Sequence, residues 1–269
     1  MTELALAAPF LLAASLYGIE VTWLTITHMR VNQVAVHVSD NASRIGDIST
    51  LEDRKIYESD INDLFLGAQY QLGDKLDLYG RGRIILSSLE TVPDSASDQQ
   101  YIHWQRCKGR RDWASSYGDE GDGYGNPGFQ GMGTTGNKVK AEPGGAVMFV
   151  EIAYDYDPIF SAELVGTRTI QSYSAYTVRA DRDLTQIYQK NDMSPDPISD
   201  CTAFDDFSGN AGRVGEPGGG PAGPGNSGGG GGGGGGDGGG NGGGGGNGGG
   251  GGGGGGNGGG GGNGGGPKK

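Results

Sequence analysis

The hydrophobic pattern is strongest at the start of the chain. No charged side chain occurs between Leu4 and Ile19, and after Glu20 the apolar run resumes through Ile26. A helix over residues 4–27 would rise about 36 Å, enough to cross a bilayer core of about 30 Å. The pattern therefore predicts a helix whose first half is buried in lipid or among other helices.

Beyond this run the apolar residues become sparser but keep the spacing of one helix face. They are Val31, Val34, Ala35, Val38, Ala42 and Ile45. Neither Gly nor Pro interrupts residues 19–45, and Gly46 is a typical helix stop. We therefore expect a single helix of about 65 Å over residues 1–46, with an amphipathic second half that lies against a soluble domain.

The next part of the chain, residues 47–205, predicts one small α+β domain. Ser59 and Asp60 are suited to cap a helix, and apolar residues follow them at helical spacing. Strand composition marks residues 76–79, 83–92, 101–107, 146–156 and 167–179. The first two of these flank Gly80-Arg81-Gly82, which indicates a hairpin.

Three segments of the chain lack a clear helix or strand pattern. Residues 108–145 form a long, polar and glycine-rich stretch, which is typical of a functional or disordered loop. Residues 181–190 fit either a short helix or a closing edge strand. Residues 206–269 hold most of the 60 glycines and predict a disordered tail, because they offer too little apolar area to offset ordering entropy. The predicted fold class is α+β, a long helix packed on a small antiparallel sheet.

Charge and cysteine content narrow the class of protein. A net charge of -12 argues against nucleic-acid binding, which needs clustered Lys and Arg. The two cysteines, Cys107 and Cys201, are far apart in the sequence and expected to pair in an oxidising compartment. Closing a loop of this length would stabilise the fold by about 4 kcal/mol. Two buried free thiols are the alternative.

The apolar run has two further interpretations, a cleaved signal peptide and a buried helix of a soluble protein. A signal peptide would begin with Lys or Arg, but no positive charge precedes Arg30. The positive-inside rule, applied to Arg30 and Arg44 after the span, would place the C-terminal part in the cytoplasm. A basic leader before the span would reverse that orientation.

The first 45 residues resemble the N-terminal segment of TadE-like proteins, pseudopilins of the tight-adherence (Flp) pilus system within the type IV pilin class. The residues that carry the resemblance are Glu3 before the apolar run, Pro9 within it, and Gly18-Ile19-Glu20 near its end. The family has a basic leader and a Gly before its mature start, so such a leader is expected upstream of Met1 or removed from this form.

The resemblance implies a single-pass inner-membrane protein with its soluble domain in the periplasm. Its implied partners are other pilin-class subunits and inner-membrane pilus assembly proteins, besides membrane lipid. By resemblance, Glu3 would offset the amine of a neighbouring subunit; alternatively, it is a solvated carboxylate favoured by the helix dipole. Glu20 would reach the membrane interface or pair with another helix. Pro9 would kink the helix without ending it.

Candidate catalytic and ligand-binding motifs are weak. Residues 131–136 spell GxGxxG, but no strand precedes them and no helix follows. Asp119, Glu120 and Asp122 offer oxygen ligands for calcium without the spacing of an EF-hand. His103 and Cys107 share a strand face but lie too far apart for one metal. We therefore expect no enzyme activity, no cofactor and no metal.

A further acidic group lies on one side of the strongest predicted strand, which ends at Pro158. Glu151, Asp155 and Asp157 alternate onto one side of that strand, which fits a polar face better than an acid–base pair.

Two functions from different classes remain. The first is a structural, non-enzymatic pseudopilin-like component of tight-adherence pilus assembly, which acts through helix packing and partner contacts. The second is a membrane-anchored periplasmic binding protein unrelated to pili, with residues 108–145 and the tail as contact surfaces.

Overall fold

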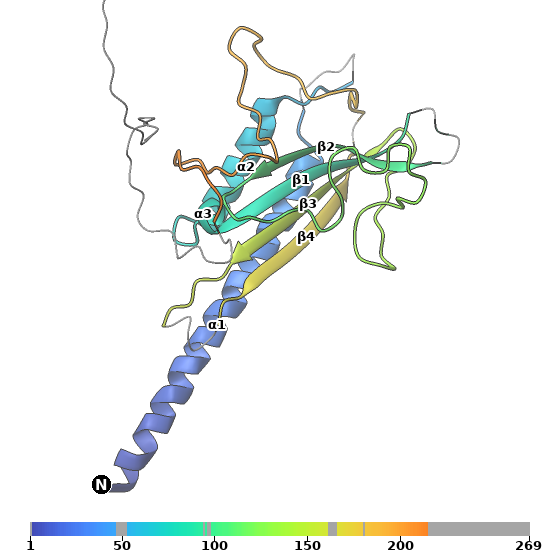
Figure 1. Cartoon of the computed structure of the whole chain (residues 1–269). Coiled ribbons are helices and arrows are strands. Elements are labelled where there is room, and N and C mark those ends of the chain that lie inside the picture. The colour runs from blue at the N-terminus through green and yellow to red at the C-terminus, as the bar shows by residue number, and fades with distance from the viewer. Residues whose placement is uncertain are drawn as a thin grey trace, which may run out of the picture. The chain divides into compact units, whose positions relative to one another are not determined.

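The computed structural model describes residues 2–46, 53–93, 95, 98–160, 166–179 and 181–214, with side chains in the first helix from residue 6 onward. The predicted α+β fold is confirmed: a long N-terminal helix packs on a four-stranded antiparallel sheet (Figure 1).

The N-terminal helix, α1, spans Thr2–Ala42 and contains Pro9 without ending there. Its 41 residues rise about 62 Å. The helix ends four residues before the predicted stop, and a buried arginine binds carbonyl groups at and just beyond this end. Arg182 donates from Nη2 to the carbonyl oxygens of Ala42, at 3.1 Å, and Ile45, at 2.6 Å. A basic side chain in this position satisfies the free carbonyls of a helix C-terminus.

The sheet consists of β1 (Gly82–Thr91), β2 (Gln100–Lys108), β3 (Ala146–Asp155) and β4 (Thr169–Thr177), in the order β2-β1-β3-β4. All three pairings are antiparallel. Leu86 illustrates the register in the two central strands, since it pairs with Arg106 of β2 and with Val150 of β3. A bulge between Ser88 and Leu89 shifts the β1–β2 register.

Helices cover one face of the sheet. The second half of α1 and helix α2 (Glu58–Leu72) pack against alternate residues of the strands, and Figure 1 shows both helices behind the sheet. The strand side chains in this core are Ile84, Leu86, Trp104, Ala146, Met148, Val150, Ile152, Tyr154 and Ile170. Helix α2 begins at Glu58, where Asp60 Oδ2 accepts a hydrogen bond from the backbone N–H of Tyr57 at 3.2 Å.

The long loop over residues 109–145 covers part of the opposite face. Met132 and Ala141 of this loop pack with Phe149 and other strand residues in a second, smaller core. Strand β3 is therefore buried on both faces, which explains its nearly continuous apolar sequence. The loop is therefore ordered against the sheet, which contradicts the disordered alternative that its composition suggested.

The predicted hairpin around Gly80-Arg81-Gly82 is wrong. Residues Leu78–Arg81 form a four-residue helix, α3, and β1 starts at Gly82 and pairs with β2 and β3. Asp77 adopts a left-handed conformation with φ 45°, and its side chain accepts from the backbone N–H of Gly80 at 3.1 Å. This local cap and the two long-range pairings together replace the expected turn.

Two further boundaries differ from the sequence prediction. Residues 181–190 form neither a helix nor a regular strand; isolated bridges join Arg182 to Arg54 and Tyr188 to Tyr57. The folded part also continues past residue 205, because Val214 donates from its backbone N–H to the carbonyl of Arg110 at 2.6 Å. The remainder of the predicted tail, residues 215–269, lies outside the described residues.

Candidate functional site

The first half of α1 presents large apolar side chains that no described part of the chain covers. Leu6 is 73% exposed and Phe10 78%, whereas Val31, later on the same helix, is 0% exposed. Helix α1 is the one helix among the described residues that is long enough and apolar enough to cross a membrane. Only 11% of its most apolar window is buried, whereas the core helix of a soluble protein would be mostly buried. The geometry thus fits a membrane-spanning segment.

Three hydroxyl groups of this segment form hydrogen bonds within the helix itself. Ser15 donates to the carbonyl of Leu11 at 2.8 Å, and Thr22 donates to the carbonyl of Gly18 at the same distance. Thr25 does the same one turn later. Such bonds to the preceding turn pair the hydroxyl donors of these three side chains, which are therefore compatible with a hydrocarbon environment.

Of the residues singled out from the sequence, two lie near the start of α1. Pro9 is exposed, and the helix runs through it. Glu3 lies within α1, but its side chain is outside the described part of the structure. Its assembly role stays a prediction.

Glu20 has well-defined partners inside the chain. Its carboxylate is 2% exposed and accepts a hydrogen bond from Tyr156 Oη at 2.6 Å. It also accepts from the backbone N–H groups of Ile159, at 3.1 Å, and Phe160, at 3.3 Å. The carboxylate is thus buried and paired within its own chain, and its predicted position at the membrane interface or pairing with another helix stays a prediction. We call Tyr156–Phe160, with Glu20, the Glu20 clamp.

The clamp is positioned by the end of β3. Tyr156 follows the last residue of that strand, and its backbone N–H donates to the carbonyl of Arg168 at 2.8 Å. Pro158 cannot donate to a strand ladder, and the segment leaves the sheet there and reaches α1. Burial and the hydrogen bond to Glu20 raise the pKa of Tyr156 well above its usual value, so its hydroxyl stays a donor at physiological pH.

Cys107 of β2 and Cys201 form a disulfide with a Cα–Cα distance of 4.7 Å. These are the two cysteines for which pairing is expected from the sequence. The bond attaches the segment after β4 to the edge strand, and the backbone N–H of Cys107 donates to Ser199 at 2.8 Å beside it. The sequence separation is 94 residues, so the bond restricts a large part of the unfolded chain.

A buried arginine holds the same C-terminal segment. Arg83 is 1% exposed and donates from its guanidinium to the carbonyls of Gly109, Cys201 and Ala203 at 2.6–3.0 Å. Its guanidinium carbon also lies 4.0 Å from the ring centroid of Phe204. Burial lowers the pKa of Arg83 to about 10, which leaves it charged at neutral pH. Arg83 therefore stabilises a structural junction.

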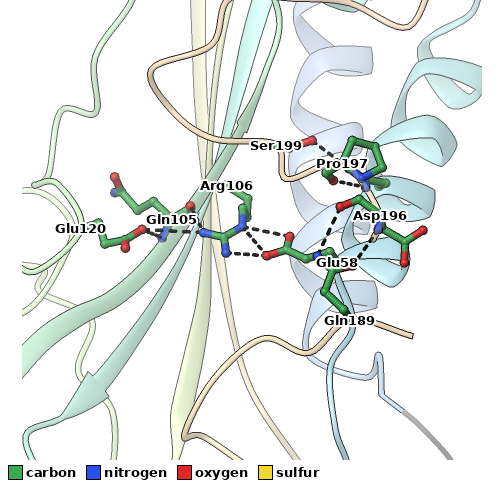
Figure 2. A network of polar contacts seen from close by, with 9 residues as sticks. Glu58, Gln105, Arg106, Glu120, Gln189, Asp196, Pro197 and Ser199 are labelled. Atoms are coloured by element: carbon green, nitrogen blue, oxygen red, sulfur yellow. Dashed lines mark hydrogen bonds and ion pairs between the residues drawn. The ribbon is translucent and has the colours of Figure 1, made fainter. Parts of the chain in front are cut away.

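Figure 2 shows a second polar network, centred on a bidentate ion pair. Arg106 donates from Nε to both carboxylate oxygens of Glu58, at 3.1 and 3.0 Å, and from Nη2 at 2.5 Å. Glu58 is almost fully buried at the start of α2. The pair connects α2 to β2, and a bidentate geometry of this kind fixes both distance and orientation.

The network also reaches the long loop. Glu120 Oε2 accepts from the backbone N–H of Gln105 at 2.9 Å and lies 3.7 Å from Arg106 Nη1. Asp122 instead accepts from the backbone N–H of Asp119 at 2.9 Å, within a turn. The described residues contain no group of three or more acidic, His or Cys side chains able to hold a metal. The calcium ligands suggested by the sequence are thus not brought together.

The other sequence candidates have separate structural partners. His103 Nδ1 lies 3.0 Å from Glu90 Oε2, and that hydrogen bond raises the pKa of His103. Cys107 is in the disulfide, so the two do not share a site. Met132, within the GxGxxG match, is fully buried in the smaller core and forms a bridge with Val139.

The three acidic residues in and just after β3 also have separate partners. Glu151 is buried and accepts from Ser115 Oγ at 2.5 Å, and burial raises its pKa. Asp155 pairs with Arg111 at 2.8 Å, and Asp157 with Arg81 at 3.0 Å. Each carboxylate thus serves a different local contact.

Comparison of the chain with family models, curated proteins and solved structures gives no match. The function is therefore argued from the geometry and the N-terminal resemblance. Sequence reasoning missed the partners of Glu20, which lie 136–140 residues away. The available signal was a single charge interrupting an apolar run, because a carboxylate in such surroundings requires a partner.

Proposed function

We propose that the chain is a membrane-anchored structural subunit, a pseudopilin-like component of tight-adherence pilus assembly. The observation that carries this proposal is the division of α1 into an exposed apolar half and a half packed on a sheet. A helix of this kind anchors a small domain next to the membrane and offers an apolar surface to neighbouring helices. The subunit acts by helix packing and partner contacts, without a chemical step.

The disulfide supports the proposed location of the domain. Disulfides persist in oxidising compartments such as the bacterial periplasm and are rare in the cytosol. The Cys107–Cys201 bond therefore favours a periplasmic domain attached to the inner membrane by one span. This orientation opposes the charge rule as applied to Arg30 and Arg44 and agrees with the one that a basic leader would give.

The alternative, a binding protein unrelated to pili, took residues 108–145 as a contact surface. Apolar side chains of this loop pack on the sheet instead, as Met132 and Phe129 do. No observation on the loop favours a separate binding function.

The test is substitution of Glu3 in a strain that carries the complete gene cluster. Glu3→Ala is expected to reduce recovery of other pilin-class subunits in pulldowns and to reduce the number of surface pili, because a carboxylate among apolar helices requires a cationic partner. Glu3→Asp is the conservative control and should retain most of both. The folded domain, followed through its disulfide, should be unchanged in both variants.

Wild-type partner recovery and pilus number in Glu3→Ala would show that Glu3 is only a solvated charge at a helix end. Absence of any co-purifying pilin-class subunit with the wild-type chain would contradict the proposed function itself.

A further inference from the structure

The Glu20 clamp carries two exposed apolar side chains. Ile159 is 50% exposed and Phe160 45%, although both backbone N–H groups are fixed by hydrogen bonds to Glu20. Figure 1 shows the segment after β3 extending beyond the sheet along α1, toward the exposed half of the helix. The clamp thus holds two large apolar groups outward at the base of the domain.

These side chains are continuous with the apolar surface of the span. Ile159 lines a groove of about 510 Å³ together with α1 residues that include Gly18, Ile19 and Ile26. Ile19 is itself 51% exposed. The surface therefore extends from the helix onto the clamp without an intervening charged residue in the groove lining.

Polar and aromatic groups mark the upper edge of this surface. Trp23 lies one turn beyond Glu20, and Lys75 Nζ lies 5.1 Å from the centroid of its ring. Asp157, at the start of the exposed part of the clamp, pairs with Arg81 at 3.0 Å. Trp beside cationic side chains is the composition found where a membrane protein passes from the hydrocarbon into the headgroup region.

We propose that the Glu20 clamp is a bilayer-contacting surface, in which Ile159 and Phe160 insert at the boundary between lipid headgroups and acyl chains. The inference rests on the proposed membrane anchoring of α1. Residues 2–20 of the helix rise about 28 Å, close to the thickness of a bilayer core, so Glu20 lies at the level where the hydrocarbon ends. There the clamp shields the carboxylate from lipid and fixes the depth of the domain.

The chain is well suited to a spin-label test, because its two cysteines are both in the disulfide. Ile159→Cys would add a single free thiol for a nitroxide label. The labelled full-length chain is reconstituted in phosphatidylcholine–phosphatidylglycerol vesicles. Collision of the label with oxygen, which concentrates in lipid, is compared with collision with a water-soluble nickel chelate.

Two further labelled positions calibrate the measurement. Leu12→Cys, in the middle of the exposed half of α1, reports the hydrocarbon, and Ile198→Cys, 55% exposed on the C-terminal segment, reports water. The ratio of oxygen collisions to nickel collisions for the label at residue 159 is expected to lie between the ratios at residues 12 and 198. Adding Glu20→Ala should release the clamp and move the ratio at residue 159 toward the value at residue 198.

Three results would overturn the inference. Equal nickel accessibility at residues 159 and 198, with a lipid-like signal at residue 12, would show that the clamp faces water although α1 is anchored in the membrane. Protection of residue 159 from both reagents would indicate a protein contact instead. A water-like signal at residue 12 would overturn the anchoring itself, and the inference with it.

Discussion

Both halves of α1 carry apolar side chains, but these side chains have opposite surroundings in the two halves. Leu12, in the first half, is 64% exposed, and Val34, six turns later, is 1% exposed. In the second half the sheet and α2 cover the helix, whereas the described chain leaves Leu6, Phe10 and Leu12 of the first half exposed. An apolar helix face thus indicates that something other than water covers it. Only the tertiary structure shows whether that cover is the protein itself or another environment.

The largest expected difference between the two halves comes from placing the same charged residue in each of them. Val34→Asp buries a carboxylate without a partner in the core and should cost about 5 kcal/mol, enough to abolish cooperative unfolding of a small domain. Leu12→Asp should leave domain unfolding unchanged in detergent, because residue 12 contacts no core residue. Thermal unfolding followed by circular dichroism measures both, and equal effects would contradict the division of α1.

The next largest effect is expected from the disulfide, which acts only on the domain. Reduction should lower the free energy of unfolding by about 4 kcal/mol, because the unfolded chain gains the freedom of a long loop. Denaturant titration with and without reductant measures this change. The double variant Cys107→Ser with Cys201→Ser should already be destabilised, and reductant should not change its stability further. A further loss of stability would show that the reductant acts on something other than this disulfide.

A smaller loss is expected from the ion pair between α2 and β2. Glu58→Gln leaves Arg106 without its bidentate partner and should destabilise the domain by about 2–3 kcal/mol. Asp63→Asn, an acidic residue exposed on the same helix, is the matched control and should change stability by less than about 0.5 kcal/mol. The measurement is the difference between the denaturation midpoints of the two variants. Equal midpoints would show that the network in Figure 2 does not stabilise the domain.

The smallest effect is the pH dependence of His103. Its hydrogen bond to Glu90 raises its pKa, so the stabilisation is complete below the ordinary pKa of histidine and is lost as pH rises through the raised value. The stability difference between wild type and His103→Gln should therefore be larger at pH 5.5 than at pH 8.5, by less than about 1 kcal/mol. A difference that is larger at pH 8.5 would contradict the pairing.

Helix α1 and strands β2 and β3 could be predicted from the sequence, because their own residues carry the pattern that determines them. The apolar run gives α1, and the β-branched and aromatic residues of 101–107 and 146–156 give β2 and β3 within one residue at each end. The hairpin expected at Gly80-Arg81-Gly82 fails because long-range pairing of β1 with β3 and the cap by Asp77 outweigh the turn signal. Such pairings connect residues 56–72 positions apart, from Glu90 with Ala146 to Gly82 with Tyr154, and leave no local pattern.

The candidate site was less predictable than the fold. The fit of the long loop to the sheet depends on a few apolar residues, such as Phe129 and Met132, that are scattered among glycines without a period. The partners of Glu20 could not be identified because two of them are backbone N–H groups, which every sequence supplies. Only the need of Glu20 for a partner was visible beforehand.

The central claim is that the first half of α1 lies in the membrane while the rest of the chain folds outside it. Flotation with phospholipid vesicles after an alkaline wash tests this for the full chain and for a variant without residues 2–18. The full chain should float, and the shortened chain should remain in the dense fraction with its sheet and disulfide intact. Flotation of both, or of neither, would contradict the claim.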